Sequence, residues 1–431
     1  MTSYQKILLL PAFLISFLLT AQTPSTKQSA FLEEAPPETV GMSSERLEHI
    51  DNLCQEAISE HQVPGIVALI ARKGKIVYHK AFGDASASTQ KPLEKDAIFR
   101  IASQSKAITS TGLMMLWEQG KFQLDDPVSK YIPEFENAQV LDTLYPDGTY
   151  KSIPADKPIT IRHLLTHTSG LGYGKIDSDE RFKKIYREAG ITDLFSTKAV
   201  TIEESIKKLA KLPLHHHPGT QFTYSEGIDV AGYLIEVLSG IPLDKYLRTH
   251  IFEPLKMTDT YFYLPKDKQK RLVEVQTWED GQWQNYQGTF YDTDYPKTGA
   301  QAFFSGGAGL SGTARDYAQF LQMYLNRGEM NGHRLLSRTT VDLILNNHIG
   351  AIWEGTGAHH GLAFKVVDNL GAAKGAQGSE GTFEWGGYFN TQYFADPKEE
   401  LIAIILKQTQ EIPNDQTAWK FRVMALTAID D

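Results

Sequence analysis

Residues 99–109 read Phe-Arg-Ile-Ala-Ser-Gln-Ser-Lys-Ala-Ile-Thr, and an apolar periodic pattern that predicts a helix begins within them. Ser103 and Lys106 are three positions apart, so on a helix they share one face. A serine hydroxyl becomes a nucleophile when a neighbouring group takes its proton. A helix N-terminus and desolvation both favour the neutral form of an amine, which can accept that proton. The pattern therefore predicts a nucleophile and its base on one turn, although solvated helices also carry this spacing by chance.

The composition is that of a globular protein that is long enough for two domains. The chain has 431 residues, of which 41% are hydrophobic, and its net charge is −9. No stripe of Lys and Arg follows the sequence, which argues against nucleic acid as a partner. Cys54 is the single cysteine, so no intramolecular disulfide can form, and its helical spacing to apolar residues predicts a packing role.

The N-terminus has the pattern of an export signal. Lys6 precedes the apolar run 7–19, and Ala21 offers a small residue for cleavage. We expect a cleaved signal peptide at residues 1–21, a periplasmic or secreted protein, and no stable membrane insertion after cleavage. Leu19 is unusual so close to a cleavage site, so an uncleaved anchor is the alternative. The polar, proline-rich residues 22–40 predict a flexible leader.

Strand patterns occur at both ends of the chain. A hairpin is expected at 65–72 and 76–82, and further strands at 392–395 and 401–406. Helices are expected at 44–61, 103–119, 124–131, 161–167, 202–212, 229–239, 314–326 and 415–429. We predict an α/β protein of the α+β type. Residues 41–105 and 300–431 form a mainly antiparallel sheet flanked by helices, and residues 106–299 form an all-helical insert, with the site between the two.

Two further stretches identify a family. Residues 164–171 read Leu-Leu-Thr-His-Thr-Ser-Gly-Leu, and residues 305–317 begin Ser-Gly-Gly-Ala-Gly-Leu-Ser-Gly. Together with Ser103 and Lys106 they resemble the class C-type branch of the serine β-lactamase and penicillin-binding-protein superfamily, from about residue 40 to 431. The resemblance implies a β-lactamase/transpeptidase-like fold. Neither stretch is expected to take part in the chemistry.

The second catalytic segment is expected at residues 222–232, which read Phe-Thr-Tyr-Ser-Glu-Gly-Ile-Asp-Val-Ala-Gly. The resemblance implies that Tyr224 acts as a base or relays a proton to the leaving group. Glu226 stands where β-lactamases have an Asn that holds the drug side chain. A carboxylate only accepts hydrogen bonds, so Glu226 is expected to contact substrate but argues against β-lactams. The pattern resembles the family VIII carboxylesterases.

The third catalytic segment has two candidates. Lys297-Thr298-Gly299 matches the Lys-Thr-Gly motif of the superfamily, but it follows turn residues and precedes the 305–317 stretch, whereas the family motif follows it. Trp385-Gly386-Gly387 directly precedes the last strands, and the esterase branch has Trp-Gly-Gly at this place.

The Trp-Gly-Gly segment is therefore the expected third motif. Gly386 and Gly387 would let a substrate approach the backbone, and Trp385 would offer it an apolar face. The Ser103 and Tyr388 N–H groups would form the oxyanion hole.

The histidine pairs and triplets do not predict a metal site. His215-His216-His217 and His359-His360 have no partner cluster at ligand spacing, so we expect solvated loops. His167 is expected to hold its loop by hydrogen bonds rather than to act as a base.

The sequence thus predicts an exported serine hydrolase that forms an acyl-enzyme on Ser103 and hydrolyses small esters, without metal or cofactor. The alternatives are a β-lactamase or D-amino-acid peptidase that cleaves amides, an acyltransferase, and a catalytically silent binding or scaffolding protein.

Overall fold

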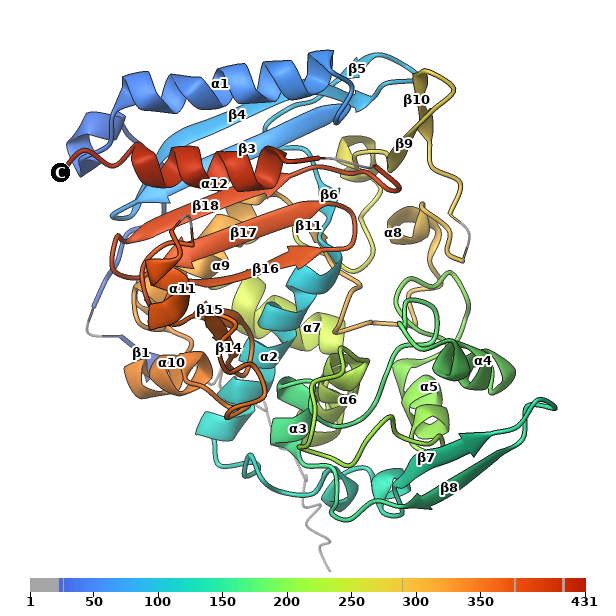
Figure 1. Ribbon diagram of the computed structural model, residues 1–431. Coiled ribbons are helices and arrows are strands. Elements are labelled where there is room, and N and C mark those ends of the chain that lie inside the picture. The colour runs from blue at the N-terminus through green and yellow to red at the C-terminus, as the bar shows by residue number, and fades with distance from the viewer. Residues whose placement is uncertain (1–22, 26, 289, 376, 413–414) are drawn as a thin grey trace, which may run out of the picture.

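The computed structural model describes residues 23–25, 27–288, 290–375, 377–412 and 415–431 (Figure 1). The expected signal peptide, residues 1–21, lies outside the described residues.

The central sheet is built from both ends of the chain. Its strands follow the order β14-β15-β16-β17-β18-β3-β4-β2, and β5 pairs with β4. Neighbouring strands run antiparallel except β2 and β4, which are parallel. Their bounds are β2 Glu33–Glu34, β3 Gly65–Arg72, β4 Lys75–Ser86, β5 Lys91–Pro92, β14 Ala358–His360, β15 Lys365–Val367, β16 Phe383–Gly387, β17 Thr391–Asp396 and β18 Leu401–Leu406.

Helices cover both faces of the sheet because successive residues of β3 and β18 point to opposite sides. Ile66, Ala68 and Ile70 pack under α1 (Ser44–Ser59) and α12 (Thr417–Thr427), which lie together over one face (Figure 1). Val67 and Leu69 face the other way, into the large core that α2 (Ser105–Glu118) and α9 (Ala314–Leu325) share. The prediction of a mainly antiparallel sheet flanked by helices is confirmed.

The insert is largely helical, and most of it lies below the sheet in Figure 1, with the hairpin at 276–285 beside the sheet. Besides most of α2, its α-helices are α3 Ile161–Leu165, α4 Glu180–Glu188, α5 Ile202–Leu209, α6 Gly227–Ser239, α7 Leu243–Leu247 and α8 Tyr295–Thr298. It also carries the hairpins β7 Gln139–Leu144 with β8 Tyr150–Pro154, and β9 Gln276–Glu279 with β10 Gln282–Asn285. The expectation of an all-helical insert is therefore wrong. The domain boundaries themselves stay a prediction.

The remaining elements are short. They are β1 Thr23–Pro24, β6 Phe99–Arg100, β11 Ser311–Gly312, β12 Glu329–Met330, β13 His333–Arg334, α10 Arg338–Leu345 and α11 Asn369–Ala373. The helix expected at 124–131 is reduced to the 3₁₀ turn Val128–Lys130. Pro127 explains the difference, because proline lacks the N–H that would continue a helix through this position.

The segment expected to be a flexible leader lies against the body of the protein. Leu32 is fully buried in the main core, and the Ser29 hydroxyl donates to Glu329 Oε2 at 2.5 Å. Glu33 and Glu34 pair with β4. Within the described residues, no helix has the length and hydropathy needed to cross a membrane.

Candidate active site

Ser103 lies at a junction between a strand and a helix. β6 pairs with β11, a 3₁₀ turn of Ala102–Gln104 follows, and α2 begins at Ser105. Ala102 has a φ of 43°, in the left-handed region that costs a non-glycine residue about 1–3 kcal/mol. The buried Arg100 guanidinium fixes the approach to this turn, since it donates to the carbonyls of Val273 and Thr293. The fold thus holds Ser103 in a constrained backbone position.

Lys106 lies one helical turn after Ser103, as the spacing predicts. Its side chain is only 4% exposed. Its Nζ lies 3.2 Å from Ser103 Oγ and donates to the Gly307 carbonyl at 2.7 Å. The amine also faces the rings of Tyr224 and Tyr173, whose centroids are 4.5 and 5.5 Å away. A buried amine with one strong acceptor and the serine hydroxyl within reach is arranged to exchange a proton with Ser103.

Tyr224 is a residue of the insert that lines the same cavity as Ser103. It lies three residues before the start of α6, and the ring of Trp385 from β16 stacks beside it with centroids 5.8 Å apart. Trp385 Nε1 donates to the Tyr224 hydroxyl at 3.4 Å. The structure therefore brings Ser103, Lys106, Tyr224 and Trp385 together from segments that are far apart in the sequence.

A cavity of about 430 Å³ opens above Ser103. It is lined by Ser103, Ile176, Leu194, Phe195, Phe222, Tyr224, Ala308, Trp385, Gly386, Gly387 and Tyr388. These include every residue of the expected Trp-Gly-Gly segment and Tyr388, which was expected to supply an oxyanion N–H. None of the described residues that line this cavity carries a charged side chain. Lys106 is not among the lining residues.

Glu226 does not line this cavity, contrary to the expectation that it contacts substrate. It precedes the first turn of α6 and is 1% exposed, and its Oε1 has no hydrogen-bond partner among the described residues. Burial, together with the nearby Asp193 and Asp229 carboxyls, raises the pKa of Glu226 well above its usual range. Glu226 therefore packs in the interior behind Tyr224 and is not part of the cavity wall that would contact substrate.

Lys297-Thr298-Gly299 does not line the cavity above Ser103. Its lysine and threonine end the short helix α8, and Lys297 forms an ion pair with Asp294. Trp385-Gly386-Gly387 instead forms the end of β16, paired with β17, and lies on the cavity wall. The preference for Trp385-Gly386-Gly387, based on position in the sequence, agrees with this geometry.

Gly307 and Asp229 lie beside Lys106, although neither was assigned a role in the chemistry from the sequence motifs that contain them. The 305–317 stretch was expected to be unnecessary for chemistry, yet its Gly307 carbonyl binds the amine of Lys106. Asp229 is buried, and its carboxylate accepts the Ser305 hydroxyl and the Gly307 N–H. The adjacent glycines at 306 and 307 were the available signal, because paired glycines allow backbone to approach a side chain closely.

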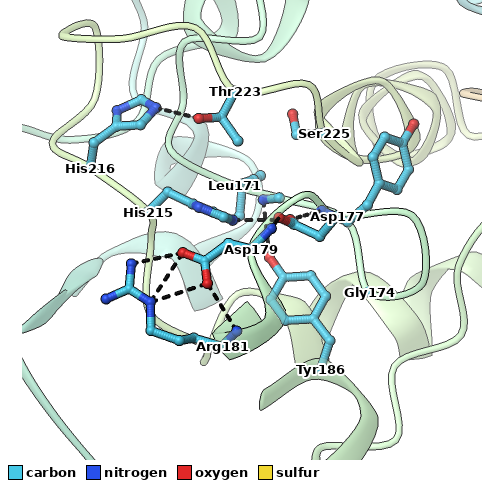
Figure 2. A network of polar contacts seen from close by, with 12 residues as sticks. Leu171, Gly174, Asp177, Asp179, Arg181, Tyr186, His215, His216, Thr223 and Ser225 are labelled. Carbon is cyan, nitrogen blue, oxygen red and sulfur yellow. Dashed lines mark hydrogen bonds and ion pairs between the residues drawn. The ribbon is translucent and has the colours of Figure 1, made fainter. Parts of the chain in front are cut away.

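Polar contacts hold the loop beside Tyr224, and Figure 2 shows them. His215 Nε2 and Asp177 Oδ2 are 3.0 Å apart, and the same oxygen accepts the Tyr173 N–H. His216 Nε2 lies 3.0 Å from Thr223 Oγ1. The expectation that these two histidines lie in a solvated loop is wrong, since they tie the loops of the insert together. Among the described residues, no group of His, Cys, Asp and Glu side chains could hold a metal ion.

His167 and His360 are buried behind Trp385. The Ser225 N–H donates to His167 Nδ1, which is therefore an acceptor. Burial lowers the pKa of His167 well below its usual range and that of His360 to about 4. Both imidazoles are neutral near pH 7. His167 was expected to hold its own loop by hydrogen bonds, and the structure shows it bonded to the Tyr224 segment, through Ser225 and Thr223.

Comparison with known proteins identifies relatives along most of the chain. The family model described as Beta-lactamase matches residues 50–427. Protein Rv1367c of Mycobacterium tuberculosis (strain ATCC 25618 / H37Rv) is 32% identical over 364 residues, which cover 80% of this chain and 85% of that protein. Esterase EstB of Burkholderia gladioli is 30% identical over 375 residues, which cover 84% of this chain and 90% of EstB.

Solved structures of related proteins have the same fold as this chain. EstCE1, described as a hydrolase with promiscuous acyltransferase activity, superposes with a TM-score of 0.75 at 28% identity and covers 90% of this chain and 98% of its own. A family VIII carboxylesterase has the same fold, with a TM-score of 0.65 at 18% identity, covering 90% of this chain and 99% of its own. The chain therefore belongs to the beta-lactamase family and is a serine hydrolase.

Proposed function

We propose that the protein is an esterase that hydrolyses small, uncharged esters through an acyl-enzyme on Ser103. The observation that carries the proposal is the 3.2 Å approach of Lys106 Nζ to Ser103 Oγ beneath a cavity with an uncharged lining. The relative EstB, 30% identical, is named an esterase. Substrates with aliphatic or aromatic acyl groups fit walls made by Phe195, Phe222 and Trp385.

In the proposed acylation step, Ser103 Oγ forms a bond to the acyl carbon while its proton passes to Lys106 Nζ. The Ser103 and Tyr388 N–H groups stabilise the oxyanion of the tetrahedral intermediate. The bond from the acyl carbon to the alcohol oxygen then breaks, and Tyr224 relays the proton to that oxygen. In deacylation, water adds to the acyl carbon, gives a proton to the same pair, and Ser103 Oγ leaves and recovers a proton.

The first test compares wild type with Ser103→Ala in matched preparations, by kcat/KM for p-nitrophenyl butyrate. Turnover that disappears in the variant supports the proposal. Full activity in Ser103→Ala would refute it. Labelling of Ser103 by a fluorophosphonate separates a slow enzyme from a silent scaffold, because only a competent nucleophile reacts.

Acyl transfer is the second candidate. It is favoured by the likeness to EstCE1, which is described as having promiscuous acyltransferase activity. An apolar cavity can admit an alcohol in place of water. Addition of a small alcohol such as 1-butanol should then divert the acyl group into a new ester, which gas chromatography measures. Hydrolysis product alone at high alcohol concentration would exclude transfer.

Amide substrates fit less well. β-lactams and D-amino-acid peptides carry a carboxylate, and no described residue that lines the cavity offers a cation to bind it. Turnover of nitrocefin should therefore be at least about a thousandfold below that of p-nitrophenyl butyrate, equivalent to about 4 kcal/mol in transition-state binding.

We also propose that the protein is exported, with cleavage after Ala21. The support is the order of Lys6, the apolar run 7–19 and the small residue at 21. Cell fractionation and N-terminal sequencing of the mature protein test this. An N-terminus at residue 22 in an extracytoplasmic fraction supports the proposal, and an intact N-terminus in the cytoplasm refutes it.

A further inference from the structure

Asp229 is a buried carboxylate that the proposed mechanism does not use. It lies in the first turn of α6 and is 1% exposed. Its Oδ1 accepts the Ser305 hydroxyl at 2.6 Å and the Gly307 N–H at 3.2 Å. A carboxylate is costly to bury unless it is hydrogen-bonded, so these two contacts hold it firmly against the 305–307 turn.

The same turn is bound to the catalytic helix on its other side. Thr109 of α2 donates its hydroxyl to the Gly306 carbonyl at 2.8 Å. The next carbonyl, that of Gly307, accepts Lys106 Nζ at 2.7 Å. Gly307 thus lies between Asp229 and Lys106, with its N–H toward the carboxylate and its carbonyl on the amine.

Contact between Asp229 and Gly307 is direct. A Cβ atom on Gly307 would lie 2.6 Å from Asp229 Oδ2, so only glycine fits here. Oδ2 itself has no hydrogen-bond partner among the described residues. Asp229 can therefore act on Lys106 in two ways. One is the negative charge of its carboxylate, and the other is the backbone of Gly307, which both side chains contact.

The charged and titratable groups that face Asp229 are Lys106 from α2, Glu226 from the residue before its own helix, and Asp193 and Tyr173 from the neighbouring loops. Burial raises the pKa of Asp229 above its usual value, and the Ser305 bond and the charge of Lys106 offset part of this rise.

Burial raises the pKa of both Glu226 and Asp193. Of the three carboxyls, Asp229 is the one on which the charge of Lys106 acts, so the negative charge of the cluster is assigned to Asp229. On the other side of the amine, the buried His167 is neutral and adds no charge.

We infer that Asp229 is a positioning residue of the Ser103 site, which fixes the amine of Lys106 through Gly307 and stabilises the ammonium formed when Lys106 takes the Ser103 proton. The inference rests on the proposed function, because it assigns a role within that proton transfer. The proton moves from Ser103 Oγ to Lys106 Nζ, and Asp229 stays ionised throughout.

The test is the pH dependence of kcat/KM for p-nitrophenyl butyrate in Asp229→Asn. The variant keeps the shape of the side chain and an oxygen for the Ser305 hydroxyl but removes the charge. We expect kcat to fall about 10- to 100-fold with little change in KM. The ammonium form loses its stabilising neighbour, so the neutral amine persists to lower pH. The acidic limb of the profile should therefore move to lower pH by about one unit.

Two matched variants separate charge from structure. Ser305→Ala removes a hydrogen bond to the same carboxylate but leaves its charge. It should lower kcat several-fold without moving the acidic limb. Asp316→Asn removes another buried carboxylate, also in the first turn of a helix, where it accepts the Thr260 hydroxyl at 2.9 Å. It should leave both kcat and the limb unchanged.

Unchanged kcat in Asp229→Asn, or an equal loss at every pH with an unmoved limb, overturns the inference. If Asp229→Asn does not accumulate as folded protein, Ser305→Ala decides, and unchanged kcat there overturns it. A wild type without esterase activity refutes the proposed function instead. The same pH series is then measured as the rate of Ser103 labelling by a fluorophosphonate, which uses the same proton transfer. Wild type that is not labelled overturns both.

Discussion

The end of β16 lies directly against the turn that carries Ser103: a Cβ atom on Gly387 would be 2.5 Å from the carbonyl oxygen of Ile101. Such a distance is too short for a carbon and an oxygen that are not bonded. The same Cβ atom would lie closer still to Thr391 Oγ1 on the neighbouring strand, so the fit of β16 against the Ser103 turn depends on the absence of a side chain at Gly387. This contact sets the position of Tyr388, the next residue, relative to Ser103.

Gly387→Ala should lower kcat/KM for p-nitrophenyl butyrate by about 10- to 100-fold, because a shift of about 1 Å between reacting groups has this cost. Gly386→Ala is the comparison. Its Cβ would meet the Thr391 carbonyl at 3.1 Å and nothing nearer, so its loss should be smaller. Equal activity in both alanine variants would contradict the assigned role of the Gly387 contact.

Lys106→Met should reduce kcat by about 10²- to 10⁴-fold, since it removes the group expected to take the Ser103 proton. The thermal midpoint should fall as well, because the buried Gly307 carbonyl loses its donor, so kcat is compared per folded molecule. Lys407→Met is the control. Lys407 is also fully buried and forms an ion pair with Asp415 at 2.6 Å, so this variant should lose stability and keep its kcat per folded molecule.

Trp385→Phe should lower kcat by about 2- to 10-fold, the net value of one hydrogen bond, with KM nearly unchanged. Phenylalanine keeps an aromatic face beside Tyr224 but lacks the N–H that donates to its hydroxyl. Trp419→Phe, on the exposed face of α12, should have no effect. An unchanged kcat in Trp385→Phe would show that this N–H does not act on the reaction.

His360 should make the fold sensitive to acid. Burial lowers its pKa to about 4, below the usual value of 6.5, so the unfolded chain binds a proton that the folded chain does not. The contribution of neutral His360 to the free energy of unfolding is therefore fully present above pH 6.5. It is lost as the pH falls toward 4, by up to about 3 kcal/mol.

The thermal midpoints of wild type and His360→Gln should thus converge between pH 7 and pH 4.5. At pH 7 the variant loses the ring packing against Trp385 and His167. At pH 4.5 the wild type loses the stability that depends on a neutral imidazole. The exposed His49→Gln is the control, and its thermal midpoint at pH 7 should match that of wild type. If the difference in thermal midpoint between wild type and His360→Gln widened in acid, that result would contradict a neutral, buried His360 in the folded protein.

Local patterns predicted what depends on local geometry. Ser103 and Lys106 could be paired from the sequence because one helical turn brings them together, whatever surrounds the helix. The strands at 65–72 and 401–406 were predictable from short apolar runs, and the family could be named from residues 164–171 and 305–317. The position of Trp385 before the last strands separated it from the misleading Lys297-Thr298-Gly299.

The sequence by itself therefore determined the family, the layers of the fold and the serine with its lysine. Only the tertiary structure decided that Glu226 is buried away from the cavity, that Gly307 binds Lys106, and that Asp229 lies behind both. Hydrogen bonds such as that from Lys106 to Gly307 join residues about 200 positions apart. No helical or strand period encodes such a contact, because it forms only when the sheet and the insert pack around the same buried amine.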